Sequence, residues 1–210
     1  MNRHLGLPCF ALVLTGFVLS SPARATVSGQ TFGPAKHATA DVPPTATPYH
    51  EFCFGDSTDI PCPCGNFGQP GHGCDNSSAT GGARLTGLGE GKVSGDTLVL
   101  SVTGERPNAF SMVGQGTLST APRVFGDGIG CIGGQIKRLY YKHAVEGAFS
   151  APEAGDPTIS ARSASLGDVL TPGANRVYTV FYRDPDPTFC SFPEGATFNV
   201  SNAFMVSWGT

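Results

Sequence analysis

Apolar and polar residues alternate along several short stretches from residue 97 onward, and a period of two predicts β-strands rather than helices. In the clearest stretch, 97–103, the side chains of Leu98, Leu100 and Val102 fall on one face. No window of ten residues has a sustained helical period. Further stretches rich in β-branched and aromatic residues predict strands at 109–118, 135–145, 176–183 and 198–208.

Glycine, proline, asparagine and aspartate separate these stretches, as expected of turns. Short strands joined by such turns predict an all-β fold, and we expect a β-sandwich of the jelly-roll or immunoglobulin-like kind. Gly114 and Gly116 lie within a predicted strand and indicate a β-bulge or close packing. Strict alternation over 135–145 gives two faces, one with Leu139, Tyr141 and Val145 and the other with Arg138, Tyr140 and Lys142.

Residues 51–79, the cysteine-rich segment, do not follow the strand pattern. Four of the seven cysteines lie there, among many glycines and prolines. Both residue types disfavour a helix, and the segment has few apolar side chains to bury. Cross-links must therefore order it. We expect the cysteine-rich segment to form one folding unit, 51–210, together with a β-sandwich at 80–210.

Two kinds of cross-link fit the cysteines. The first is a set of three disulfides made by Cys53, Cys62, Cys64, Cys74, Cys131 and Cys190. Short loops close easily, which favours local pairing. The expected pairs are Cys53–Cys62, Cys64–Cys74 and Cys131–Cys190. The second is tetrahedral zinc held by Cys62, Cys64, His72 and Cys74, although a C-x-C spacing makes a cramped chelate.

The first 25 residues have the features of a secretory signal. A basic start precedes a mostly apolar run at 5–19 and the small-residue cleavage motif Ala23-Arg24-Ala25. The run is too short for a stable transmembrane span. Cleavage near Ala25 would remove Cys9 and leave an even number of cysteines, which favours the disulfides. We therefore expect a secreted, periplasmic or cell-surface protein without a membrane span.

Residues 26–50 are rich in threonine, alanine and proline, and this composition predicts a flexible leader outside the core. Signal cleavage would remove two arginines and no acidic residue, so that 11 basic residues face 16 acidic ones. Such a mildly acidic chain has no electrostatic footprint for nucleic acid or an anionic membrane. The expected partner is an extracellular protein or a glycan.

The sequence Gly126-Asp127-Gly128 has two interpretations. Asp-Gly is first a turn signal, because both residues tolerate a positive φ. Asp127 could also offer a carboxylate to calcium, although the EF-hand pattern is absent. We predict no cofactor, with calcium at this turn as the possible exception.

Arg183 and Asp184 follow a strong predicted strand and precede a proline. They could bind a polar ligand, or they could simply end the strand in an extended conformation. Tyr140, Tyr182 and Trp208 could form a stacking platform for a carbohydrate. Packing is the commoner role of strand aromatics, and we expect Trp208 to anchor the last strand in the core.

Catalytic groups are dispersed along the sequence. None of the four histidines after the signal lies near a nucleophile motif, and the glutamates stand in separate glycine- and proline-rich contexts. His143 lies on a predicted strand, where ordinary packing is its expected role. We predict no catalytic residue.

Several phrases occur in order through residues 51–208. They are Phe52-Cys53-Phe54-Gly55-Asp56, Cys62-Pro63-Cys64-Gly65-Asn66, Gly73-Cys74-Asp75-Asn76-Ser77, Phe125-Gly126-Asp127-Gly128, Cys131-Ile132-Gly133-Gly134, Arg138-Leu139, Phe181-Tyr182-Arg183-Asp184-Pro185, Cys190 and Phe198-Asn199-Val200-Ser201-Asn202-Ala203. In this order they resemble an uncharacterised family of exported, cysteine-containing β-domains from environmental bacteria. The resemblance implies a secreted β-domain, sometimes part of larger surface proteins, and no known activity.

We therefore expect a non-enzymatic structural or binding module of the cell surface or extracellular space. A carbohydrate-binding module is the first alternative. A secreted hydrolase or metal-binding protein that uses Cys62, Cys64, His72 and Cys74 is the second.

Overall fold

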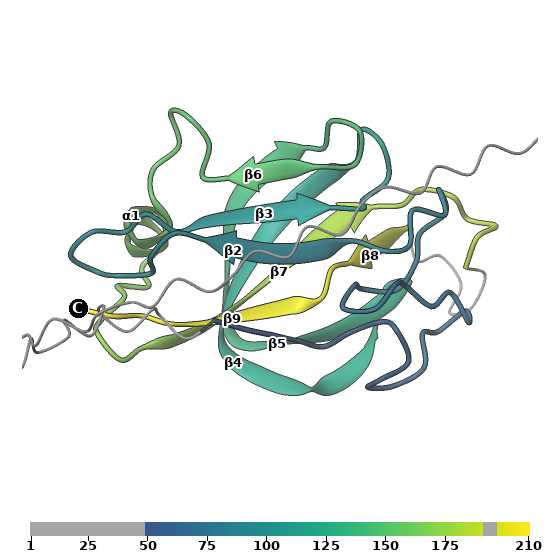
Figure 1. The fold of residues 1–210 in the computed structure, drawn as a ribbon, viewed down its shortest axis with the longest axis horizontal. Helices are drawn as coiled ribbons and strands as arrows, with labels where there is room; N and C mark the ends of the chain where they lie inside the picture. Colours follow the sequence, from purple (N-terminus) through teal and green to yellow (C-terminus); the bar gives the residue numbers. More distant parts are fainter. Residues whose placement is uncertain (1–48, 191–196) are drawn as a thin grey trace, which may run out of the picture. The chain divides into compact units, whose positions relative to one another are not determined.

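Two antiparallel β-sheets form the framework of the protein in a computed structural model that describes residues 49–190 and 197–210. The larger sheet has the strand order β1-β9-β7-β4-β5, with β8 paired to β7, and the smaller has the order β2-β3-β6 (Figure 1). This sandwich-like arrangement confirms the predicted all-β class. The elements are β1 (Tyr49–Phe52), β2 (Arg84–Leu88), β3 (Val99–Thr103), β4 (Phe110–Phe125), β5 (Gly128–His143), β6 (Phe149–Ala151), α1 (Ile159–Ser165), β7 (Asn175–Arg183), β8 (Phe198–Val200) and β9 (Ala203–Ser207).

Each predicted strand is present, with changes at its ends. The stretch 97–103 forms β3, and 176–183 forms most of β7. The stretches 109–118 and 135–145 are parts of the longer strands β4 and β5. The stretch 198–208 divides into β8 and β9 because Asn202 leaves the strand pattern. Its buried side chain bonds to both the N–H and the carbonyl of Leu85, at 2.6 and 3.1 Å, and so links the two sheets.

The predicted signal peptide, 1–25, lies outside the described residues, as does the predicted leader up to residue 48. The predicted boundary between the leader and the folded part, at residue 50, is wrong. Tyr49 and His50 already belong to β1, where they pair with Val206 and Met205 of β9.

The main hydrophobic core lies between the two sheets. Leu85, Leu100 and Val102 of the smaller sheet belong to it, as does Ile159 of α1. The larger sheet contributes Val113, Leu139, Tyr140, Tyr178, Val180, Phe204 and Val206. Trp208 follows the last strand, is buried, and donates its Nε1–H to the Tyr178 hydroxyl at 3.1 Å. Its predicted role as a core anchor is confirmed.

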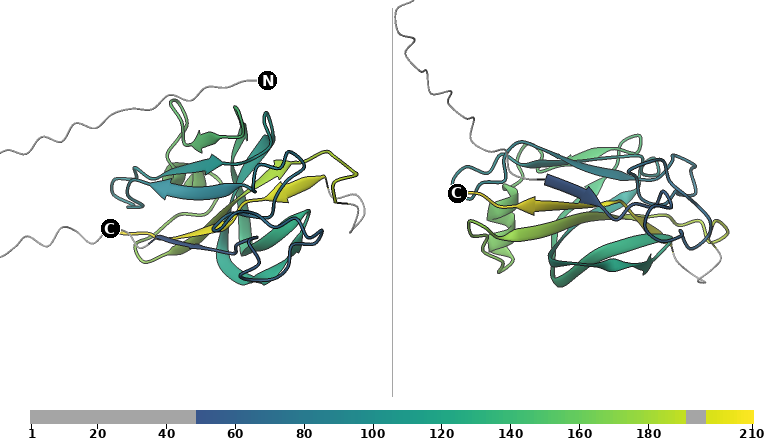
Figure 2. Two further views of the ribbon diagram at one scale, coloured as in Figure 1. Left: turned by 45° about the vertical axis from the view of Figure 1, so that its right-hand side comes forward. Right: turned by 60° about the horizontal axis from the view of Figure 1, so that its bottom comes forward.

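The opposite face of the larger sheet is also covered, because the β4–β5 hairpin folds back over it. Each strand of the hairpin has 16 residues, and their pairing shifts register at three places. Only residues 111–116 of β4 pair with β7. Beyond Gly116 the hairpin turns back, and its turn lies near the C-terminal end of β7. There the Phe125 ring contacts the rings of Phe181 and Phe198, with centroids 5.4 and 5.1 Å apart. The distal half of the hairpin therefore forms a further layer (Figure 2).

A β-bulge in β5 changes the predicted division of side chains between faces. Val113 pairs with Tyr140 and Gly114 with Arg138, so Leu139 has no partner in β4. As a result Leu139 and Tyr140 are both buried, whereas Tyr141 is 50% exposed. The prediction that Leu139 shares a face with Tyr141 is wrong for this reason. The irregularity suggested by the nearby glycine is confirmed.

The cysteine-rich segment is held by three disulfides, as predicted, but none of the expected pairs forms. The bonds are Cys53–Cys131, Cys62–Cys74 and Cys64–Cys190, with Cα atoms 6.0, 5.9 and 5.5 Å apart. The expected pairs assumed that local loop closure decides connectivity. In the structure, burial decides it, because Cys53, Cys62, Cys74 and Cys131 belong to a second apolar cluster on the face of the larger sheet that the hairpin covers.

Candidate functional site

A groove lies between the body of the larger sheet and the turn of the folded-back hairpin. Its volume is about 700 Å³, and we call it the aromatic groove. It is lined by Met112, Phe125, Ile136, Arg138, Phe181, Arg183 and Phe198. These residues come from four strands: β4, β5, β7 and β8. The folding back of the hairpin brings them together.

Two backbone features place the aromatic rings of the groove. Gly114 of β4 lies beneath Phe181, because a Cβ at that position would stand 2.6 Å from Phe181 Cε2. Gly126, with φ +63°, allows the tight turn that follows Phe125. The Phe125 ring then meets both Phe181 and Phe198 edge-on. Phe125 is still 36% exposed and Ile136 is 47% exposed, so the groove presents apolar surface to solvent.

Arg138 and Arg183 give the aromatic groove a positive charge. Both are exposed, and neither guanidinium has a hydrogen bond or an ion pair within the part of the chain that the structure describes. Other arginines are paired: Arg84 with Glu51 near the surface, and Arg176 with Asp168 in a largely buried pair. Two guanidinium groups without partners beside an apolar surface fit a ligand with carboxylates or phosphates.

The apolar surface continues from the aromatic groove toward the open end of the hairpin. A smaller hollow of about 150 Å³ adds Phe110 and Tyr182 to four residues that it shares with the groove, namely Met112, Phe181, Arg183 and Phe198. The Phe110 ring stacks on Tyr141, with centroids 5.8 Å apart. His143 lies at this end too, 5.1 Å from Phe110 between ring centroids, so it packs on the surface.

A pair of buried carboxylates lies behind the hairpin turn. Asp127 occupies the turn, as predicted for Gly126-Asp127-Gly128, and its backbone N–H donates to the Phe198 carbonyl at 3.0 Å. Its side chain is fully buried, and neither carboxylate oxygen has a hydrogen-bond partner among the described residues. Burial, together with the negative charge of Asp184, raises the pKa of Asp127 to about 7.

Asp184 directly follows β7 and is also fully buried. Both of its oxygens accept hydrogen bonds from Ser77, one from the backbone N–H at 2.9 Å and one from the hydroxyl. The Arg106 Nε lies 3.3 Å from the same carboxylate. Asp184 thus ends the strand and ties the cysteine-rich segment to it. The sequence allowed Asp184 to bind a polar ligand from solution, but its side chain is fully buried. Arg183, which the sequence also suggested, lines the aromatic groove.

The carbohydrate platform suggested by Tyr140, Tyr182 and Trp208 does not form, because all three rings are buried. The Tyr140 hydroxyl donates to the Pro157 carbonyl at 2.8 Å, and the Tyr182 hydroxyl accepts from Asn76 at 3.3 Å. Their polar atoms are therefore used inside the protein. The ligand-binding role predicted for Tyr140 and Tyr182 stays a prediction, since each lines a hollow even though its ring is buried.

The zinc site suggested by Cys62, Cys64, His72 and Cys74 does not form either. The three cysteines are in disulfides, and His72 Nδ1 lies 2.7 Å from the Gly82 carbonyl. Within residues 49–190 and 197–210, no group of three or more histidine, cysteine, aspartate or glutamate side chains is placed to hold a metal ion.

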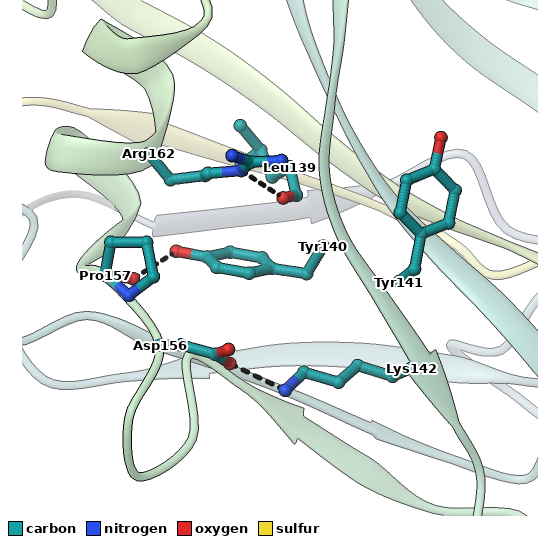
Figure 3. A pocket seen from close by; sticks show the side chains of 7 residues that line it. All are labelled: Leu139, Tyr140, Tyr141, Lys142, Asp156, Pro157 and Arg162. Carbon is teal, nitrogen blue, oxygen red and sulfur yellow. Dashed lines mark hydrogen bonds and ion pairs between the residues drawn. The ribbon is translucent and has the colours of Figure 1, made fainter.

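A second hollow, of about 310 Å³, lies beside β5 and near α1 (Figure 3). Its charged groups already pair with one another or with the backbone. Lys142 lies 2.6 Å from Asp156, and Arg162 Nε donates to the Leu139 carbonyl at 2.7 Å. Tyr140 points into this hollow, whereas Tyr141 lies on the other side of the strand. Because its polar groups are satisfied, this hollow is a weaker candidate than the aromatic groove.

Sequence reasoning missed most of the groove. Ile136, Phe181 and Phe198 fall in predicted strands and Phe125 lies outside them, and nothing in the spacing of the four indicates that the hairpin folds back. The one usable signal is the length of apolar and β-branched sequence on both sides of Gly126-Asp127-Gly128, which a two-residue turn would join into one long hairpin.

The chain matches no known protein-family model, and comparisons with curated proteins and with solved structures found no match. The described residues contain no helix that is both long and apolar enough to cross a membrane. Three disulfides fit a protein that folds outside the reducing cytoplasm.

Proposed function

We propose that this chain is a non-enzymatic binding module of the cell surface or extracellular space, and that its aromatic groove binds an extended peptide segment of an extracellular protein. The observation that carries the proposal is the placement of Arg138 and Arg183, both without partners, beside the exposed rings of the groove. Apolar side chains of the peptide would cover Phe125 and Ile136. Carboxylates of the peptide would pair with the two arginines.

The chemistry of the lining favours a peptide over a carbohydrate. Five of the seven lining side chains are those of phenylalanine, methionine and isoleucine, which cannot bond to sugar hydroxyls. Only the two arginines donate hydrogen bonds from side chains. A polyhydroxylated ligand would therefore lose hydration along most of the groove without replacement, which is unfavourable.

Export supports the same proposal. Three disulfides suit an oxidising compartment, and the sequence has the features of a cleaved signal. The resemblance to exported β-domains of environmental bacteria agrees with a surface role. A rigid sandwich that presents a groove at one face is a common way to build a binding site.

The test uses fluorescein-labelled octapeptides in which phenylalanine alternates with glutamate, matched to peptides with lysine or glutamine in place of glutamate. We expect the glutamate peptides to bind the full mature chain, as measured by fluorescence anisotropy, and to bind more weakly as salt increases. Replacing both groove arginines, Arg138→Ala and Arg183→Ala, should weaken binding by about tenfold or more, because one good charge pair is worth about 1.4 kcal/mol or more.

The matched control is Lys137→Ala, which removes a positive charge from the neighbouring position of β5. Arg176, and to a smaller extent Lys137, lower the pKa of Asp168, so Lys137 lies toward Asp168 and not in the groove. This variant should bind like the wild type. Equal binding of glutamate and lysine peptides, or an unchanged affinity in the double arginine variant, would reject the proposal. If an uncharged polysaccharide binds, and its binding depends on Phe125, the carbohydrate-binding alternative would replace the peptide proposal.

A further inference from the structure

The carboxylate of Asp127 needs a partner that the described side chains do not supply. It is fully buried behind the β4–β5 turn, and both of its oxygens lack a hydrogen-bond donor. A buried ionised carboxylate without any partner is so unfavourable that native proteins neutralise it or place a cation against it. Asp127 is therefore the group from which a search for a ligand begins.

The charges around Asp127 favour a cation. Asp184 is close enough for its negative charge to act on Asp127. The backbone carbonyls of Asp75 and Asp127 also lie near each other, because Asn66 Nδ2 donates to both, at 2.7 and 2.9 Å. Arg106, on Asp184, is the basic group paired with these acids. Two carboxylates against one guanidinium leave a net negative charge at the turn, which favours a bound cation.

We propose that Asp127 and Asp184 bind Ca²⁺ at the turn of the β4–β5 hairpin. Calcium takes six to eight oxygen ligands, and these include carboxylates, backbone carbonyls, amide oxygens and water, so two carboxylates are enough when other oxygens are near. The Asn199 side-chain oxygen lies against Gly128 of the same turn. Because Gly128 has no Cβ, the turn and this buried asparagine can approach closely. The donor set is rich in oxygen and contains no sulfur or imidazole, which suits calcium rather than zinc.

The calcium site would lie directly behind the aromatic groove. Phe125 is two residues before Asp127, and Phe198 accepts the Asp127 backbone N–H at 3.0 Å. A cation here would fix the turn that holds one wall of the groove. The proposal does not depend on the function of the groove, because calcium binding is measured without a peptide.

The experiment compares the full mature chain, purified without chelator, with the same protein after EDTA treatment and desalting. Mass spectrometry of metals should find one calcium per chain before EDTA, and calorimetry should find one Ca²⁺ site afterwards. We expect EDTA to lower the thermal midpoint by about 5 °C or more, and added Ca²⁺ to restore it. If the protein contains no calcium, shows no heat of Ca²⁺ binding and keeps the same midpoint after EDTA, the proposal is overturned.

Asp127→Asn keeps the size of the side chain and removes its charge, so it should abolish both the calcium and the EDTA response. Asp184→Asn is the second variant, and it is used if Asp127→Asn fails to fold. It should bind calcium more weakly than the wild type. Glu90→Gln is the matched control, because that carboxylate is exposed, pairs with Lys92 and is far from the hairpin turn in the sequence. It should respond to EDTA like the wild type. An Asp127→Asn protein that still binds one calcium would overturn the assignment.

Discussion

Glu105 is a buried carboxyl group with incomplete hydrogen bonding. One oxygen accepts the Ser111 hydroxyl at 2.6 Å, and the other has no partner among the described residues. Burial raises the pKa of Glu105 from 4.5 to about 8, although the bond from Ser111 opposes the shift. The folded protein therefore keeps a proton on Glu105 at pH 7, where the unfolded chain has lost it.

This difference predicts a pH dependence with a definite sign. Because the folded state binds the proton more tightly, the contribution of Glu105 to the free energy of unfolding is greatest below pH 4.5. It falls by up to about 1.4 kcal/mol per pH unit as the pH rises toward 8. Glu105→Gln cannot ionise, so this variant should become more stable than the wild type as the pH increases.

The measurement is urea unfolding of both proteins at pH 5 and pH 8.5. The difference in unfolding free energy between them isolates Glu105, because all other titrating groups are shared. We expect the variant to gain relative stability at the higher pH. Parallel pH profiles for the two proteins would show that the pKa of Glu105 is not raised in the folded protein.

At the scale of secondary structure, the sequence predicts where strands lie better than how they are arranged. Period-two patterns locate β3 and β7 well, because local side-chain alternation is visible in the sequence. Among the described residues there is one helix, α1, which has only seven residues and Thr158 as its N-cap. Seven residues are too few to show a helical period in the sequence. The bulge at Leu139 cannot be predicted from alternation, since it breaks that pattern.

The folded-back hairpin and the disulfide pairs escape prediction for a shared reason. Both depend on contacts between segments that are far apart in the sequence, such as Cys53 with Cys131, which are 78 residues apart. Loop-closure arguments favour short loops, but the cost of a longer loop grows only slowly. Burial of cysteines against Ile129 and Val177 is enough to decide the pairing instead. The aromatic groove forms only because the hairpin folds back, so the sequence could not predict the groove either.

The bond between Cys53 and Cys131 should hold the distal half of β5 in place. Cys131 lies in that half, and Cys53 directly follows β1. Replacing both with alanine should lower the free energy of unfolding by about 4 kcal/mol in the chain-entropy account of a loop this long. It should also speed hydrogen exchange at residues 128–133, as measured by mass spectrometry.

The matched control replaces Cys62 and Cys74 with alanine. That disulfide closes a loop of 12 residues within the cysteine-rich segment and forms no cross-link to the hairpin strands. Its removal should cost about 3 kcal/mol and leave the exchange rate at 128–133 near that of the wild type. Equal exchange in the two variants would show that packing alone holds the hairpin.

At the scale of the whole molecule, the three disulfides link the cysteine-rich segment, the larger sheet and the folded-back hairpin. Cys62–Cys74 orders the cysteine-rich segment, Cys53–Cys131 fastens the hairpin, and Cys64–Cys190 joins that segment to the chain after β7 across 126 residues. A typical disulfide contributes about 2–4 kcal/mol, whereas a domain of this kind has about 5–15 kcal/mol of total stability. Loss of all three is therefore comparable to the whole free energy of folding.

We expect the fully reduced protein to be unfolded at 37 °C. Five of the six disulfide cysteines are nearly inaccessible, at no more than 4% exposure, so reduction requires urea together with the reductant. After alkylation and removal of urea, circular dichroism should lack the β-sheet signal and the cooperative melting of the oxidised protein. An oxidised sample taken through the same urea cycle controls for damage by the procedure. A reduced, alkylated protein that melts cooperatively would show that the sandwich core is sufficient alone, and that the disulfides serve the cysteine-rich segment and the hairpin rather than the fold.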